Sequence, residues 1–154
     1  MHNRPEENQE TVAAWELTEL QKRGIEARVE KNPVLTFMGI EVLEIRPGEA
    51  TVLLRHREDF HNSLGQVQGG VVAVVADVAG GVSLYSVLPD PREFAIPTIE
   101  FKLNFLRPAG AEDLLARGAT GLPGSTGGCL PGGRIGRIGK ASGDRALHVH
   151  GQTY

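Results

Sequence analysis

Hydrophobic and polar residues follow distinct patterns along the chain, and the first pattern predicts an N-terminal helix. Between Thr11 and Glu30, apolar residues recur among charged ones on a roughly helical spacing: Val12, Trp15, Leu17, Leu20, Ile25 and Val29. This pattern is typical of an amphipathic helix that packs one face on a larger body. Asn32-Pro33 ends it, because the residue before a proline disfavours helical backbone.

Two further elements precede the middle of the chain. The stretch MGIEVLEI alternates into the turn Arg46-Pro47-Gly48, and EATVLLRHR follows, so residues Met38 to Arg57 predict a β-hairpin. Residues 59–65 have the composition of a loop. From Gly69 to about Val87 the chain is apolar on nearly every side, which indicates a helix enclosed by other structure and ended by Pro89-Asp90-Pro91.

Alternation returns after this helix. In AIPTIEFKLNFLRPAG, apolar side chains from Ile99 to Phe105 alternate with Glu100, Lys102 and Asn104, which predicts a strand with one solvent-exposed face. AEDLLARGAT is the start of another predicted strand, and RALHVHGQTY at the end of the chain predicts the last one.

A glycine-rich segment interrupts these strands. Residues 118–143 contain half of the chain's 20 glycines, and apolar alternation nearly vanishes there. Glycine weakens the interior of a strand, so the segment is a loop excursion, a poorly ordered part of the sheet, or a locally altered reading of the gene. The sequence does not choose among these three.

The order of elements predicts an α+β fold in which an antiparallel sheet curls around one long central helix, with an extra N-terminal helix. A chain of 154 residues with 40% hydrophobic content is large enough for one core. We expect a helical segment over residues 1–32 and one domain over residues 33–154, with residues 118–143 undefined.

Charge and composition exclude several classes of protein. A net charge of −3 without a basic cluster argues against nucleic acid as a partner. The apolar run from Val71 to Val78 is broken by Asp77 and is too short to span a membrane, and MHNRPEENQE is not a secretory signal. A single cysteine, Cys129, excludes an internal disulfide, so we expect a cytoplasmic protein.

Motifs for other chemistries are weak. His148 and His150 lie two apart without an acid or cysteine cluster, so no metal is expected. GGRIGRIGK lacks the serine or threonine and the first glycine of a phosphate-binding loop. No Gly-x-Ser-x-Gly elbow is present, which makes a serine hydrolase improbable.

A family resemblance is carried by HNSLGQVQGGVVAVVAD, by TIEFKLNFLRPA and by the closing GQTY. These stretches resemble the hotdog-fold acyl-CoA thioesterases, in particular the phenylacetyl-CoA-thioesterase-like (PaaI-like) subgroup. The resemblance runs from Pro33 to Ala116 and resumes in the last ten residues, while the glycine-rich segment departs from it. It implies hydrolysis of an acyl- or aryl-CoA, no cofactor beyond the coenzyme A of the substrate, and homodimers that often pair into tetramers.

Thioester hydrolysis needs hydrogen-bond donors at the carbonyl oxygen and a base or nucleophile at the carbonyl carbon. Gly69 and Gly70 lie where loop becomes helix, so their free N–H groups could be those donors, although Gly-Gly before a helix is also ordinary turn chemistry. Asp77 is a carboxylate among Val, Ala and Gly. Because uncompensated burial of a charge is costly, Asp77 should meet partners or line a cavity.

The spacing of these residues predicts a dimer. Asp77 follows Gly69 by eight residues, which is roughly 12 Å along a helix, so one thioester cannot touch both. Two antiparallel copies of the helix across a two-fold axis would place Asp77 of one subunit opposite Gly69 of the other. The resemblance implies the same arrangement.

The resemblance also assigns roles to single residues. Asp77 matches the catalytic acid, as base or as nucleophile, Gly69 matches the oxyanion donor, and Asn62 matches a residue that orients the thioester or the water. Asn62 is equally well explained as a turn residue. Gln68 stands where many relatives have histidine, so it can hydrogen-bond substrate but cannot titrate. The remaining substrate-binding candidates are Gly70, Thr98 and His61.

Some alternatives stay open at this point. Thr98 matches a hydroxyl that holds the attacking water in some relatives, but threonine is also a common strand former. Arg107 could meet a phosphate of coenzyme A or lie in solvent. Beside the thioesterase, the alternative function is a non-catalytic acyl-CoA-binding hotdog protein, and a hotdog hydratase is a weaker third because no histidine follows Asp77 at short range.

Overall fold

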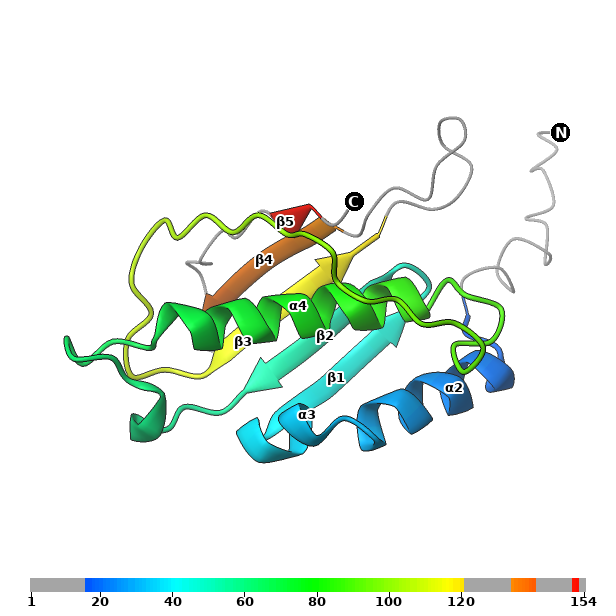
Figure 1. The fold of residues 1–154 in the computed structure, drawn as a ribbon, viewed down its shortest axis with the longest axis horizontal. Coiled ribbons are helices and arrows are strands. Elements are labelled where there is room, and N and C mark those ends of the chain that lie inside the picture. Colours follow the sequence, from blue (N-terminus) through cyan, green and yellow to red (C-terminus); the bar gives the residue numbers. More distant parts are fainter. Residues whose placement is uncertain (1–15, 121–133, 141–150, 153–154) are drawn as a thin grey trace, which may run out of the picture.

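The structure is a computed structural model, and it describes residues 16–120, 134–140 and 151–152 (Figure 1). The helices and the single 3₁₀ turn in these ranges are α2 (Glu19–Glu30), α3 (Pro33–Met38), η1 (Glu58–Phe60) and α4 (Gly69–Tyr85). The strands are β1 (Ile40–Arg46), β2 (Glu49–Leu54), β3 (Leu114–Ala119), β4 (Arg134–Lys140) and β5 (Gly151–Gln152). None of the helices in these ranges is long and apolar enough to cross a membrane.

The five strands form one sheet in the order β1-β2-β3-β4-β5, and every neighbouring pair is antiparallel. Figure 1 shows α4 lying across one face of this sheet, with α2 and α3 beside the edge formed by β1. The predicted α+β class, an antiparallel sheet around one long helix with an extra N-terminal helix, is confirmed.

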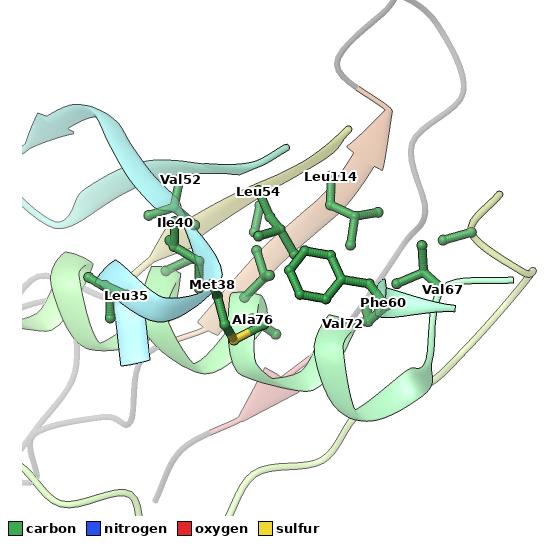
Figure 2. Packing of buried hydrophobic residues seen from close by; sticks show 14 residues of the cluster. Leu35, Met38, Ile40, Val52, Leu54, Phe60, Val67, Val72, Ala76 and Leu114 are labelled. Atoms are coloured by element: carbon green, nitrogen blue, oxygen red, sulfur yellow. The ribbon is translucent and has the colours of Figure 1, made fainter. Parts of the chain in front are cut away.

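The core lies between the sheet and α4. Val52 and Ala116 point from the sheet, Val75 and Ala79 point from the helix, and all four are fully buried. Figure 2 shows the end of this cluster where Phe60 and Val67 join it from the loop before α4. Burial on this scale holds α4 rigidly, so residues on its remaining face have fixed positions.

β3 and the middle of α4 approach each other closely at Gly118. A Cβ atom built on Gly118 would overlap the backbone carbonyl of Ala79. Glycine is therefore required at this position, since only a residue without a side chain lets the strand pass so near the helix.

The N-terminal helix starts later than predicted. Thr18 and Gln21 form a capping box, in which the Thr18 hydroxyl accepts from the Gln21 N–H and the Gln21 side chain accepts from the Thr18 N–H. This cap fixes the first turn at Glu19. The expectation of helix from Thr11 is wrong for residues 16–18, while residues 11–15 lie outside the described ranges.

The short helix α3 was not predicted. Asn32 caps it by accepting a hydrogen bond from the Val34 N–H, Pro33 occupies its first turn, and Gly39 ends it with a φ of 72°. Asn32-Pro33 ends one helix and begins the next, because proline suits the first position of a helix as well as it stops a preceding one. As a result, Met38 belongs to α3 and not to the hairpin.

The hairpin itself is confirmed as β1 and β2, with Gly48 at a φ of 80° in the turn, although β2 ends at Leu54 and not at the predicted Arg57. α4 begins at Gly69 as predicted and ends at Tyr85, slightly before Val87. The Gly48 N–H donates to the Ser86 hydroxyl, 2.8 Å away, directly after the last residue of α4. This hydrogen bond ties the hairpin turn to the C-terminal end of the helix.

The predicted strand from Ile99 to Phe105 is wrong. Between Phe94 and Arg107, the β-assignments amount to a single bridge residue, Phe101. Alternation shows which side chains share a face, but a strand also needs a hydrogen-bonded partner of matching length, which the segment itself does not encode. Most side chains of this segment are exposed, while Phe101 and Leu103 are half-buried and Leu103 packs against the core.

The glycine-rich region is partly described. β3 confirms the strand predicted to start in AEDLLARGAT. β4 pairs with β3 although two of the seven residues of β4, Gly136 and Gly139, are glycines. The remainder of residues 118–143 from Gly121 to Gly133 and after Lys140 lies outside the described ranges, as do Cys129, His148 and His150. Of the predicted last strand, Gly151 and Gln152 form β5. The division at residue 32 stays a prediction.

Candidate active site

Asp77 lies on the half-buried face of α4, and it meets the extended segment that follows the helix. The Thr98 hydroxyl donates a hydrogen bond to Asp77 Oδ1 at 2.7 Å. This contact leaves Oδ2 of Asp77 without a protein partner among the described residues. The chain therefore brings together two of the residues singled out from the sequence, although the segment that carries Thr98 is not the predicted strand.

A cavity opens beside this pair. Its volume is about 190 Å³, and its walls come from α2, α3, α4 and the segment at Ile96 and Thr98. Asp77 lines it together with Val78 and Gly81. The expectation that an acid on an apolar helix should meet a partner and line a cavity is satisfied in both respects.

The N-terminal end of α4 offers backbone donors. Gln68 is the N-cap with extended backbone (φ −60°, ψ 133°), and its side chain makes no capping hydrogen bond. The N–H groups of Val71 and Val72 both donate to the Gln68 carbonyl, whereas those of Gly69 and Gly70 meet no acceptor among the described residues. Free N–H groups at the positive end of a helix are suited to an anionic oxygen.

A second cavity lies at this end. It measures about 390 Å³ and is lined by Gly69, Val72, Phe105 and Arg107, among others. The Nη2 atom of Arg107 is buried and has no hydrogen-bond partner in the described part of the chain. A buried guanidinium nitrogen next to a helix N-terminus gives this cavity a positive potential.

Asn62 has a structural role in the loop before α4. Its Oδ1 atom accepts from the Leu64 N–H at 2.9 Å and from the Gln66 N–H at 3.2 Å, which is an Asx turn. The interpretation as a turn residue is thus correct for the oxygen. The Nδ2 amide is left as the group that could donate to a substrate.

His61 contacts a residue that the sequence did not single out. Its Nε2 atom lies 2.8 Å from Nε2 of His56, so one of the rings donates and the other accepts. The His56 N–H donates to Asp113, and this bond and the Arg55 guanidinium lower the pKa of the Asp113 carboxyl. No periodicity links His56 and Asp113, which lie 57 residues apart, so sequence patterns could not pair them.

The two groups of candidate residues are separate within one chain. Asp77 and Thr98 line one cavity, Gly69 lines the other, and the two cavities have no lining residue in common. Gln68 and Gly70 are exposed at the Gly69 end. The geometry thus places a carboxylate with a hydroxyl at one place and free amide donors roughly 12 Å away along the helix.

Comparison with known proteins gives the family. Residues 64–120, from the loop before α4 through β3, match the model of the thioesterase superfamily. The "Putative esterase VNG_1336C" of Halobacterium salinarum is 34% identical over 105 residues, which are 66% of this chain and 69% of that protein. The chain belongs to the thioesterase superfamily. The resemblance noted from the sequence is thereby confirmed.

Solved structures agree on the fold of this thioesterase superfamily member. The Escherichia coli PaaI protein from the phenylacetic acid degradation operon has a TM-score of 0.73 at 20% identity, covering 88% of this chain and 92% of that chain. A thioesterase family protein from Silicibacter pomeroyi has a TM-score of 0.71 at 24% identity, covering 86% and 95%. The fold is the hotdog fold of PaaI-like proteins, and the family indicates a thioester hydrolase.

Proposed function

We propose that the protein is an acyl-CoA thioesterase that hydrolyses an acyl- or aryl-CoA to the free acid and coenzyme A. The observation that carries the proposal is the Asp77–Thr98 pair, which faces a cavity on the same helix that presents free amide donors at Gly69. A carboxylate and preorganised N–H donors are the two components that thioester hydrolysis requires.

We propose further that each active site forms between two subunits. Because Asp77 and Gly69 open to different cavities, a single chain holds two halves of a site. In a two-fold dimer with antiparallel α4 helices, Asp77 would lie opposite Gly69 of the partner subunit, and the symmetry would create two equivalent sites.

Exposed apolar side chains support a second copy as the partner. Ile99 is 85% exposed, Leu106 63% and Phe105 54%, and all three belong to the segment that flanks α4. Leu64, in the loop before Gly69, is 77% exposed. Large apolar side chains gathered along one helix are typical of an interaction surface, and a dimer that covers α4 would bury them.

The chemistry follows from the positions of these groups. Asp77 acts on the carbonyl carbon, either by taking a proton from a water molecule that attacks it or by attacking directly through Oδ2. Thr98 holds Oδ1 and has a lone pair left to bind the water. The carbonyl oxygen becomes an oxyanion that accepts hydrogen bonds from the N–H groups of Gly69 and Gly70. Collapse of this intermediate breaks the C–S bond and expels the coenzyme A thiolate. If water attacked, the free acid is the product and the thiolate takes up the proton that Asp77 removed from the water. If Asp77 attacked, water then hydrolyses the acyl–Asp77 anhydride to the free acid and supplies the proton that the thiolate takes up.

The other candidates surround this centre. Asn62 would donate from Nδ2 to the thioester or the water, while Gln68 and His61 would contact substrate at the mouth of the Gly69 cavity. No step requires a metal or a cofactor beyond the coenzyme A of the substrate.

The test is thiol release from a panel of acyl-CoA substrates, with wild type compared with Asp77→Asn. We expect turnover by the wild type that falls by about 10²–10⁴-fold in the variant, because the isosteric amide cannot act as base or nucleophile. Binding of the acyl-CoA should be nearly unchanged. If the wild type binds acyl-CoA but releases no thiol, the protein is a non-catalytic acyl-CoA-binding hotdog protein and the proposal is wrong.

A further inference from the structure

The cavity beside Asp77 is lined by apolar side chains from two helices in addition to polar ones. Ile25 and Val29 of α2 and Val78 and Val82 of α4 line it together with Asp77 and Thr98. The N-terminal helix is thus a wall of this cavity and not only a cover for the edge of the sheet. Whatever group enters past Asp77 would contact side chains from both helices.

Two polar side chains on the wall away from Asp77 already have protein partners. The Arg28 guanidinium donates to the carbonyls of Pro91, Arg92 and Phe94 and lies 5.5 Å from the centre of the Tyr85 ring. Asn32 accepts the capping hydrogen bond of α3. Because these two groups are satisfied and Ile25, Val29, Val78 and Val82 lie on the same wall, this part of the cavity favours an apolar occupant.

The size of the cavity limits that occupant. A volume of about 190 Å³ is slightly larger than the roughly 150 Å³ that holds a benzene molecule in an engineered protein cavity. The space therefore accommodates roughly six to eight carbon atoms, as one ring with a short link or as a medium chain. A long-chain fatty acyl group would extend beyond this space.

Gly81 leaves open space in the wall of this cavity because it has no side chain. It lies one helical turn beyond Asp77, on the same side of α4, and it lines the cavity. A Cβ atom built on Gly81 would meet no heavy atom within 4 Å. The absence of a side chain here leaves open space next to the place where a carbonyl carbon would react.

We propose that the cavity between α2 and α4 is the pocket for the acyl group, and that Gly81 sets the length of acyl group it accepts. This inference rests on the proposed thioesterase function. It assigns the N-terminal helix a role in specificity, and it predicts that side chains placed at position 81 shorten the acyl group that can be hydrolysed.

The experiment compares Gly81→Ala and Gly81→Val with wild type on straight-chain acyl-CoAs from acetyl to decanoyl and on benzoyl-CoA. We expect kcat/KM for octanoyl-CoA to fall by about tenfold or more in Gly81→Val, with a smaller fall in Gly81→Ala, while acetyl-CoA and butyryl-CoA change little. Val78→Ala, which enlarges the same cavity, should shift the preference toward longer chains.

Stability serves as an independent readout. Alanine stabilises the interior of a helix relative to glycine, so Gly81→Ala should raise Tm while it lowers activity on long chains. Gly110→Ala is the matched control, since its new Cβ would make only an ordinary contact with Glu112 at 3.9 Å and it lies away from this cavity. This control should leave the chain-length profile unchanged.

A binding measurement tests the proposed acyl pocket independently of the proposed thioesterase activity. Non-hydrolysable S-octyl-CoA and S-ethyl-CoA are titrated into wild type and Gly81→Val, with heat of binding as the signal. Weakening of the octyl ligand alone supports the pocket even if the wild type hydrolyses nothing. Equal effects on both ligands, or none on either, together with a chain-length profile that Gly81→Val does not alter, would overturn it.

Discussion

The two regions of α4 that we propose to form the active site differ in the kind of chemistry they offer. At its N-terminus the helix presents backbone N–H groups of Gly69 and Gly70, next to a cavity lined by Arg107, which has a buried and unpartnered nitrogen among the described residues. Two helical turns further along, it presents the Asp77 carboxylate beside the other cavity. In the proposed function, the first region would stabilise a developing negative charge, and the second would supply a base or nucleophile.

The two faces of α4 differ in how closely they are packed. On the face turned to the sheet, Ala76 and Ala79 are fully buried and Gly118 contacts the helix backbone. On the other face, a Cβ atom on Gly70 or on Gly81 would meet nothing within 4 Å. In the proposed function, the open face of one chain therefore carries two complementary halves of a site, each beside a cavity of its own.

Removing the N–H of Gly69 should have the largest effect. Gly69→Pro deletes this donor at a position where proline is tolerated, because it is the first residue of α4 and Gln68 already has the extended backbone that precedes proline. We expect kcat to fall by about 10²–10³-fold. Gly69→Ala keeps the N–H and adds a Cβ atom 3.3 Å from the movable Phe105 ring, so it should retain most of the activity. Similar losses in both variants would argue against an oxyanion role.

Much of this site could be predicted from the sequence, for a physical reason. An acid within an apolar helix and a Gly-Gly pair at its start are local signals, so the start of α4 at Gly69 was predicted correctly, and Asp77 meets a partner and lines a cavity as expected. The catalytic roles of Asp77 and Gly69 stay predictions. Pairing of distant residues leaves no such signal. The His56–His61 contact, the Asp113 carboxylate and the wall formed by α2 depend on how elements pack, and so they were missed.

The predicted strand at Ile99–Phe105 is an error of the opposite kind, because a clear local pattern predicted an element that the structure lacks. Its alternation is clear, yet pairing depends on a second strand elsewhere in the chain. Thr98, the candidate site residue just before this segment, was singled out through the resemblance and not through the alternation. Its hydrogen bond to Asp77 does not require a strand.

A methyl group at Gly118 should strongly destabilise the fold. Gly118→Ala would force β3 and α4 apart at Ala79, where overpacking typically costs about 1–3 kcal/mol. Gly70→Ala at the other end of the comparison should be neutral or stabilise by up to about 1 kcal/mol, since there is space for the methyl group. Urea unfolding of both variants measures the difference. Equal stabilities would mean that the face of α4 turned to β3 is not packed more closely than its open face at Gly70.

Loss of the Thr98 hydroxyl should have an intermediate effect on activity. Thr98→Val removes the 2.7 Å hydrogen bond to Asp77 and keeps the shape of the side chain, so we expect kcat to fall by about tenfold, equivalent to one hydrogen bond. Thr98→Ser keeps the hydroxyl and should stay near wild type. If valine and serine variants had the same kcat, the hydroxyl would have no part in positioning Asp77 or water.

The smallest effect concerns the loop that leads from α4 to Thr98. Arg92 donates to Asp90 from its side chain and from its backbone, which lowers the pKa of Asp90 to about 2. A lowered pKa stabilises the fold above the ordinary value near 4, and this contribution is lost as pH falls toward 2. Asp90→Asn should therefore have a lower urea midpoint than wild type from pH 5 to 7, and the gap should narrow below pH 4. A gap that does not depend on pH would show that the charge is not involved.

The central claim is that Asp77 and Gly69 act in the same site from different subunits, and subunit mixing tests it directly. Asp77→Asn and Gly69→Pro chains carrying two different affinity tags are co-expressed, and the mixed dimer is purified over both tags. Such a dimer has one site with both groups intact and one with neither. We predict about half of the wild-type turnover per dimer, from two proteins that are each nearly inactive alone. A mixed dimer no more active than either variant by itself would contradict the account.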